Sequence, residues 1–278
     1  MQPPYQPPIP YGLTPAPSAS NIVMIIFGVL ALGLIVEAVR DWRRRGQPLM
    51  LVLVVAAVVT NLDEGIADHL GFVWYSDIDQ DVWYRSFVPM PLWMVPAYIV
   101  FFAGLTTVVM RSIDARVTRK SFVLTAVVCW AVNLAIEVPL MSTGVYTYYG
   151  DNQPFSVNGF PLYWLVLNAT GPLIAAAVLC RFRAFFTGAR LLLVIPLLPM
   201  CYAASLGAIG FPIFNLLHSA APQWAVEVGA LITILLGLSV WWFVMELAAR
   251  DGRFNAYYAP AGSQAQAVEV EPRTHAAA

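Results

Sequence analysis

Long apolar runs recur along this chain, and they restrict what it can fold into more than any motif does. A helix of about 20 apolar residues crosses the ~30 Å hydrocarbon core of a bilayer. Hydrophobic residues make up 59% of the 278 residues and charged residues only 11%, whereas a soluble domain carries about 25% charged residues. We therefore predict an all-α polytopic membrane protein with seven transmembrane helices, at residues 22–39, 49–70, 91–110, 121–140, 161–179, 191–217 and 224–248.

The two ends of the chain differ in composition from the predicted membrane domain of residues 21–250. Residues 1–20 contain seven prolines and no charged residue, a composition that favours a flexible, partly polyproline-II chain. Residues 251–278 are rich in alanine and polar residues. We predict that both tails are disordered and that the chain has one membrane domain.

Arginine and lysine are concentrated after the first, third, fifth and seventh predicted helices, with Arg85 as the one exception. Because positively charged loops stay in the cytoplasm, we expect the N-terminus outside the cell membrane and the C-terminus in the cytoplasm. Glu37 and Glu246 lie beside arginines near the cytoplasmic ends, where we expect them to form ion pairs. The cations that decide the orientation are Arg40, Arg43, Arg44, Arg45, Arg111, Arg116, Arg119, Lys120, Arg181, Arg183, Arg190, Arg250 and Arg253.

Acidic residues inside the predicted helices are the main functional signal. At ~1.5 Å per residue, Asp63 and Glu64 of the second helix reach the same height as Glu137 of the fourth, in the outer half of the bilayer. An acid inside a membrane helix costs about 2.5–3.5 kcal/mol on insertion scales, so several at one level favour a shared cavity open towards the outer leaflet. Asn61, Glu64 and Asp68 share one helical face. Asp63 points about 100° away from that face.

Further polar groups are expected at the same level. Asn133 precedes Glu137 by one helical turn and shares its face. Asn168 lies in the fifth predicted helix, His218 ends the sixth, and Glu227 begins the seventh. The alternative is that these groups hydrogen-bond between helices or lie in headgroup water, and the sequence leaves this alternative open.

Residues 61–93 and 133–164 resemble two copies of one helix–loop–helix unit. Each begins with an asparagine and a glutamate, passes a glycine and aromatic residues, and ends at a Pro-Leu pair before an aromatic ring. Both begin on the predicted cytoplasmic side, so the repeat would be parallel; chance similarity is the alternative. A ring beside a carboxylic acid can stabilise a carbocation. The aromatic residues that flank the acids are Trp74, Tyr75, Tyr146, Tyr148, Tyr163 and Trp164.

Several classes of function are disfavoured by the residues that the sequence lacks. A retinal pigment needs a lysine in its last helix, and the only lysine is Lys120, in a predicted cytoplasmic connection. Cys129, Cys180 and Cys201 lie singly inside predicted helices, so we expect neither disulfides nor a metal site. Motifs for zinc peptidases, serine hydrolases and nucleotide binding do not occur. We expect no metal, no cofactor and no nucleic-acid partner.

The fourth predicted helix leads into the pattern E-x-x-x-M-x-T-G-x-Y-T-Y-x-G, from Glu137 to Gly150, followed by Phe155 and Pro161-Leu162. This pattern resembles the avermectin-type spirocyclase (AveC-like) family of actinobacterial integral membrane proteins, over about residues 50–185 of this chain. The resemblance implies spiroketal closure and dehydration of a polyketide. A weaker resemblance, to membrane carotenoid hydratases and terpene cyclases with a glutamate before a similar turn, implies an isoprenoid substrate.

The sequence therefore favours a membrane-embedded cyclase or dehydratase of secondary metabolism, with a lipophilic polyketide or isoprenoid as substrate. Glu137 or Glu64 would donate a proton to a carbonyl, hydroxyl or alkene, and Asp63 would take a proton back or stabilise the cation. A proton-coupled transporter or small-molecule-binding protein that uses the same acids is the main alternative, and an accessory membrane subunit is the third. The residues expected to bind the substrate are Asn61, Asn133, Asn168, Trp74, Tyr75, Tyr146, Tyr148, Trp164, His218 and Glu227.

Overall fold

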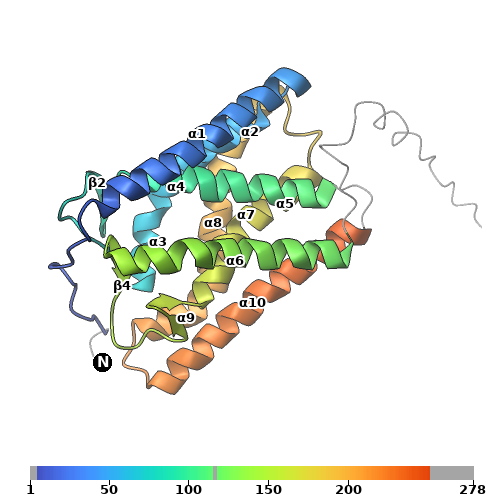
Figure 1. Ribbon diagram of the computed structural model, residues 1–278. Helices are drawn as coiled ribbons and strands as arrows, with labels where there is room; N and C mark the ends of the chain where they lie inside the picture. Colours follow the sequence, from blue (N-terminus) through green and yellow to red (C-terminus); the bar gives the residue numbers. More distant parts are fainter. Residues whose placement is uncertain (1–4, 115–117, 251–278) are drawn as a thin grey trace, which may run out of the picture.

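The computed structural model describes residues 5–114 and 118–250, and the predicted C-terminal tail at 251–278 lies outside the described residues. Within the described ranges, seven helices are long and apolar enough to cross a membrane, which confirms the predicted helical class. They pack as one bundle (Figure 1). Their segments are α1 (Ala19–Arg45), α2 (Leu49–Thr60), η1 (Asn61–Asp63), α3 (Glu64–Gly71), α4 (Met94–Tyr98), η2 (Ile99–Ala103), α5 (Gly104–Asp114), α6 (Arg119–Thr143), α7 (Tyr163–Arg181), η3 (Gly188–Leu193), α8 (Val194–Ile209) and α10 (Gln223–Arg250).

The sixth predicted helix, residues 191–217, is divided in the structure. The segment η3–α8 ends at Ile209, and a separate short helix, α9 (Phe211–Leu217), follows Gly210. Pro212 lies in the first turn of α9. Proline has no N–H to donate to the preceding turn and suits the start of a helix, which explains why one apolar run forms two helices.

The helix α7 is the most buried of the seven and packs against α5, α8 and α10. It approaches α8 closely at Gly171, where an added Cβ would lie 2.9 Å from the Tyr202 Cα. This contact brings the Tyr202 backbone against α7. The helices α1 and α6 are the least buried of the seven. In Figure 1, α1 forms the upper edge of the bundle and α6 crosses its near face.

Ion pairs join helices at one end of the bundle, at the right in Figure 1. Glu37 of α1 lies 3.4 Å from Arg111 of α5. Glu246 of α10 lies 2.8 Å from Arg119 of α6. Both glutamates therefore form the ion pairs that their positions beside arginines predict.

Short antiparallel strand pairs lie at the opposite end, where the apolar runs predict only connections (Figure 1). The strand β1 (Val73–Tyr75) pairs with β4 (Tyr146–Tyr148), and Tyr75 lies opposite Tyr146. Aromatic and β-branched residues dominate both strands, a composition that suits a pleated surface. The other pairs are β2 (Val82–Arg85) with β3 (Pro89–Pro91) and β5 (Ser156–Val157) with β6 (Phe160–Pro161).

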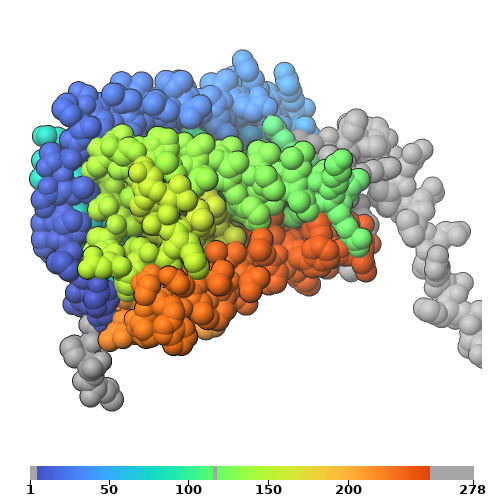
Figure 2. All heavy atoms as spheres, turned by 60° about the horizontal axis from the view of Figure 1, so that its bottom comes forward, coloured from blue at the N-terminus to red at the C-terminus, as the bar shows by residue number. Residues whose placement is uncertain are grey.

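Residues 5–18, here called the N-terminal segment, pack along this strand-bearing end, although their composition predicts a disordered tail. The Tyr5 N–H donates to the His218 carbonyl (3.1 Å) and the Ala16 N–H to the Thr143 carbonyl (2.7 Å). The Ser76 hydroxyl donates to the Leu13 carbonyl (2.6 Å). Backbone hydrogen bonds of this kind do not depend on side-chain polarity, so composition alone does not reveal them. Figure 2 shows the segment, in dark blue, against the bundle.

Candidate functional site

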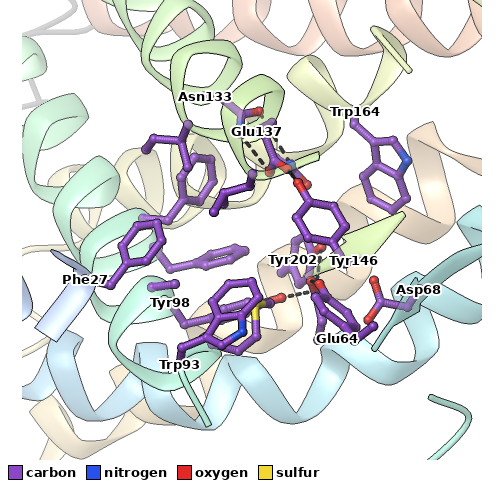
Figure 3. A pocket seen from close by; sticks show the side chains of 18 of the residues that line it. Phe27, Glu64, Asp68, Trp93, Tyr98, Asn133, Glu137, Tyr146, Trp164 and Tyr202 are labelled. Atoms are coloured by element: carbon purple, nitrogen blue, oxygen red, sulfur yellow. Dashed lines mark hydrogen bonds between the residues drawn. The ribbon is translucent and has the colours of Figure 1, made fainter. Parts of the chain in front are cut away.

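A cavity lies inside the bundle near the strand-bearing end, with about 700 Å³ of empty space including its opening. Residues of seven helical segments and of the β1–β4 pair form its wall (Figure 3). The lining residues are Phe27, Glu64, Asp68, Tyr75, Trp93, Met94, Ala97, Tyr98, Phe101, Phe102, Asn133, Ile136, Glu137, Leu140, Tyr146, Tyr148, Trp164, Asn168 and Tyr202.

Three tyrosine hydroxyls converge on the carboxyl group of Glu64, the first residue of α3. Tyr75 of β1 donates to Oε1 (3.2 Å), and Tyr202 of α8 donates to Oε2 (3.3 Å). Tyr98 of α4 also donates to Oε2. Because the three donors come from three separate elements, the Glu64 carboxyl is oriented by the assembled bundle.

The carboxyl group of Glu137 in α6 has a more local set of partners. Asn133, one turn earlier on the same helix, donates from Nδ2 to Oε1 (3.2 Å), as the four-residue spacing predicts. Tyr146 donates to Oε2. The Asn168 Nδ2 lies 3.5 Å from the Asn133 Oδ1, which links α7 to this group. In the view of Figure 3, the Tyr146 ring lies between Glu137 and Glu64.

The tyrosine donors remain protonated over the whole physiological range. Burial raises the pKa of the Tyr75 and Tyr146 hydroxyls well above the usual value for a phenol, and nearby carboxyl groups add to the rise. A protonated phenol keeps one O–H to donate. The two glutamates therefore keep these donors in a chamber whose remaining wall is mostly apolar.

Asp68 is a third carboxyl group in the cavity wall, four residues after Glu64 and therefore on the same face of α3. Only 2% of its surface is exposed, and its Oδ2 has no hydrogen-bond partner among the described residues. The shared face of Glu64 and Asp68 was the sequence signal for this residue. No comparable signal marks Tyr98 or Tyr202, which are isolated phenols in long apolar runs.

Five of the sequence-predicted residues do not line the cavity. Asn61 is fully buried one turn before Glu64, and both polar atoms of its side chain lack a partner in the described structure. Asp63 is half-buried and belongs to η1, about 100° around the helix from Glu64. Trp74 packs edge-on against Tyr11 of the N-terminal segment, with ring centroids 5.1 Å apart.

His218, which follows α9, and Glu227 of α10 also lie outside the cavity wall, whose last residue in the chain is Tyr202. The His218 ring contacts the Leu70 carbonyl (3.1 Å) and packs on Phe72. The eight predicted residues that the structure brings together at the cavity are Glu64, Glu137, Asn133, Asn168, Tyr75, Tyr146, Tyr148 and Trp164.

Within the described ranges, no three His, Cys, Asp or Glu side chains are grouped so that they could hold a metal ion. Protein-family models, curated proteins and solved structures were compared with the chain, and none of them matches it. The described part of the chain is thus a bundle of seven apolar helices that contains an aromatic cavity with three carboxyl groups in its wall.

Proposed function

We propose that this protein is a membrane-embedded, cofactor-independent cyclase or dehydratase that acts by acid–base chemistry on a lipophilic polyketide or isoprenoid. The observation that carries the proposal is the pair Glu64 and Glu137. They come from different helices, each accepts a hydrogen bond from at least one tyrosine, and both line one aromatic cavity. A positioned proton donor and a positioned acceptor around one substrate are what such a reaction needs.

The reaction begins when one glutamic acid donates its proton to a carbonyl, hydroxyl or alkene of the substrate. In a dehydration, the protonated hydroxyl leaves as water. In a cyclisation, an alkene or hydroxyl oxygen of the same molecule attacks the cationic carbon and closes the ring. The other glutamate then takes a proton from the substrate, and proton exchange between the carboxyl groups restores the starting state.

Aromatic side chains in the cavity wall support a cationic intermediate. Trp93, Tyr98 and Tyr146 line the cavity together with the two glutamates (Figure 3). A ring face attracts a cation within about 6 Å of its centroid, and the attraction grows when water is excluded. The aromatic wall thereby stabilises a cationic intermediate also at positions where no carboxylate is nearby.

The orientation in the membrane forms part of the proposal. The ion-paired end carries the arginine clusters, so the positive-inside rule assigns it to the cytoplasm of the cell. The cavity, the strands and the N-terminus then lie on the extracytoplasmic side. A lipophilic substrate would reach the cavity from the outer half of the bilayer.

A parallel internal repeat is supported by the order of helices and strands, which is the same in residues 61–93 and 133–164. In each, a carboxyl-bearing helix leads to one strand of the β1–β4 pair, and a short strand with a proline precedes the next helix. Glu64 and Glu137 are then equivalent residues of two units that face one cavity.

A proton-coupled transporter is the second candidate. It is favoured by the lining of the cavity, to which the described residues contribute three carboxyl groups and neither arginine nor lysine, because buried acids of this kind also serve as proton relays. Uptake of a substrate into proteoliposomes, with the recovered molecule chemically unchanged, would support transport and contradict the cyclase.

Metabolite profiling of a deletion strain, complemented by Glu137→Gln, tests the proposed enzyme. Glutamine keeps the shape and an acceptor oxygen but cannot donate the proton of an acid. We expect the deletion strain to accumulate an uncyclised or hydroxylated intermediate, and Glu137→Gln to leave that accumulation uncorrected. Glu37→Gln, at an exposed ion pair, is the matched control and should restore the product. Full restoration by Glu137→Gln would refute the assignment.

A further inference from the structure

The strand pair β1–β4 forms part of the cavity wall with one of its two faces. Tyr75 lies opposite Tyr146, and both residues line the cavity. Successive side chains of a strand point to opposite faces, so Trp74, the residue before Tyr75, points away from the cavity. A single layer of backbone therefore separates the cavity from whatever covers Trp74.

The N-terminal segment, residues 5–18, covers this outer face. Tyr11 packs edge-on against Trp74, with ring centroids 5.1 Å apart. The Tyr5 ring lies 6.3 Å from that of Phe72, which directly precedes β1. Trp74 and Phe72 are only 6% and 3% exposed, although neither lines the cavity. The segment, dark blue in Figure 1, is thus a second layer outside the strand pair.

Hydrogen bonds connect the segment to a residue that lines the cavity. The Ser76 hydroxyl, directly after β1, donates to the Leu13 carbonyl (2.6 Å). The Gln80 Nε2 donates to the Ser76 carbonyl (2.8 Å), and the Gln80 Oε1 accepts from the Trp93 indole N–H (2.7 Å). Because Trp93 lines the cavity, the two layers are joined by a continuous series of hydrogen bonds.

The segment also approaches the turn between α6 and β4 very closely. Gly144 in this turn has a φ of +72°, a conformation that favours glycine. An added Cβ would lie 2.9 Å from the carbonyl oxygen of Thr14. The turn joins the helix of Glu137 to the strand of Tyr146, so the segment fits tightly over a connection between two residues of the site.

Water inside the cavity would change the outcome of the proposed reaction. When a water oxygen bonds to the cationic carbon of an intermediate and the added water then loses a proton, the product is an alcohol. Ring closure and dehydration therefore require that the cation react before water reaches it. A site that excludes water prevents such side reactions.

We propose that the N-terminal segment sets the product specificity by keeping bulk water out of the cavity, and that Tyr5 and Tyr11 hold it in place. Residues 5–18 contain five prolines and no charged residue, and proline lowers the conformational entropy that a segment loses when it docks. The effect on products rests on the proposed function, whereas the exclusion of water is measurable without turnover.

Thiol labelling from the aqueous phase tests the exclusion of water. Met94 is buried and lines the cavity, so Met94→Cys places a thiol inside it. Full-length protein in nanodiscs is treated with a charged methanethiosulfonate that does not enter bilayers. The three native cysteines are buried and give the background rate. Met94→Cys should react no faster than this background, and Thr14→Cys, at an exposed position of the segment, should react fast.

Release of the segment should open the cavity to the reagent. Tyr5→Ala together with Tyr11→Ala removes both ring contacts and should raise the labelling rate of Met94→Cys by at least about fivefold, since each aromatic pair is worth roughly a factor of two to ten. Thr14→Ala is the matched control, because the Thr14 hydroxyl donates to Gly12 of the segment itself, and it should leave the rate unchanged. Thermal unfolding shows that the variants are folded. If the double variant does not fold, Tyr11→Ala decides, because this residue is 66% exposed.

The effect on products is measured in the deletion strain, grown in water enriched in a heavy oxygen isotope. Complementation with the Tyr5→Ala and Tyr11→Ala double variant should yield an alcohol that carries the heavy oxygen at the former cationic carbon. The original protein and Thr14→Ala should not yield it. Consumption of the substrate should continue, because neither tyrosine lines the cavity.

Rapid labelling of Met94→Cys with the segment intact, or an unchanged rate in the double variant, would overturn the exclusion of water. Faster labelling without the heavy alcohol would refute the effect on products. These outcomes are separable from that of the proposed enzyme. If Glu137→Gln keeps full turnover, the catalytic assignment is refuted, while the labelling rates still decide whether the segment closes the cavity to water.

Discussion

Glu64 and Glu137 line one cavity, but the structure holds their carboxyl groups in different ways. Glu64 accepts from Tyr75, Tyr98 and Tyr202, which lie on three elements distant from one another in the chain. Glu137 accepts from residues four positions before it and nine positions after it. One environment is a product of tertiary packing, and the other is largely encoded by neighbouring sequence.

This difference determines which changes remove hydrogen bonds from each carboxyl group. A change that shifts α8 relative to α7 moves a donor to Glu64 and leaves both partners of Glu137 in place. Loss of a single donor removes a larger share of the support of Glu137, because only one tyrosine reaches it within the described residues. Glu64 therefore has more donors than Glu137, whereas the donors of Glu137 lie closer to it in the sequence.

The largest expected effect is on turnover. We expect Glu137→Gln and Glu64→Gln each to lower the rate by about 10²–10⁴-fold, the usual contribution of a general acid or base. Product formation by the purified variants in nanodiscs measures the rate, and thermal unfolding shows that each protein is folded. If one glutamine variant keeps the full rate, the two acids do not act as a pair.

Removal of single tyrosine hydroxyls sharpens the comparison. Tyr146→Phe should lower turnover by about 10–100-fold, because a hydrogen bond to a charged group contributes about 1.5–3 kcal/mol. Tyr202→Phe should lower it by less than about threefold, since two other donors to Glu64 remain. Similar losses in the two variants would show that redundancy at Glu64 has no functional value.

A glycine substitution at the α7–α8 contact should affect stability. Gly171→Ala places a Cβ 2.9 Å from the Tyr202 backbone, and overpacking of this kind costs about 1–3 kcal/mol. Gly207 in α8 has open space around its added Cβ. Gly207→Ala should therefore be neutral or stabilise by up to about 1 kcal/mol. Unfolding in mixed detergent micelles measures the stability of both variants. If Gly171→Ala is as stable as the original protein, the close approach of α7 and α8 at this residue is not needed.

The smallest effect is expected for the two asparagines that begin the matched units. Asn133→Leu removes a donor to Glu137 and should destabilise the fold by about 0.5–1.5 kcal/mol. Asn61→Leu removes a buried amide without a described partner and should be neutral or stabilising by about 1 kcal/mol. The same unfolding assay compares them. A large loss of stability in Asn61→Leu would indicate that the Asn61 side chain has a polar partner.

Sequence patterns were sufficient for the features that depend on local spacing. Apolar run length predicted the seven long helices, and adjacent arginines predicted the ion pairs of Glu37 and Glu246. A four-residue spacing predicted that Asn133 would meet Glu137. The contact between Asn133 and Glu137 joins residues one helical turn apart, and the helices follow from a property summed over many residues. For Glu37 and Glu246 the sequence predicts ion pairing but not the partners, because Arg111 and Arg119 lie 74 and 127 residues away in the chain.

The remaining part of the site depends on packing that no local pattern describes. Tyr98 and Tyr202 are single phenols in apolar runs, and their inward direction follows from how α4 and α8 pack. Asp63 and Asp68 flank Glu64 in the sequence, yet only Asp68 joins the cavity wall. The strands were not predicted either, because β1 and β4 pair only when segments that are distant in the sequence come together.

The N-terminal segment has a consequence for the order of assembly during synthesis. Tyr5 hydrogen-bonds to His218, and Ala16 to Thr143. Translation reaches both acceptors after the segment itself, so the segment cannot make these contacts until α6 and α9 have been synthesised. Its docking would therefore report that the later helices are in place.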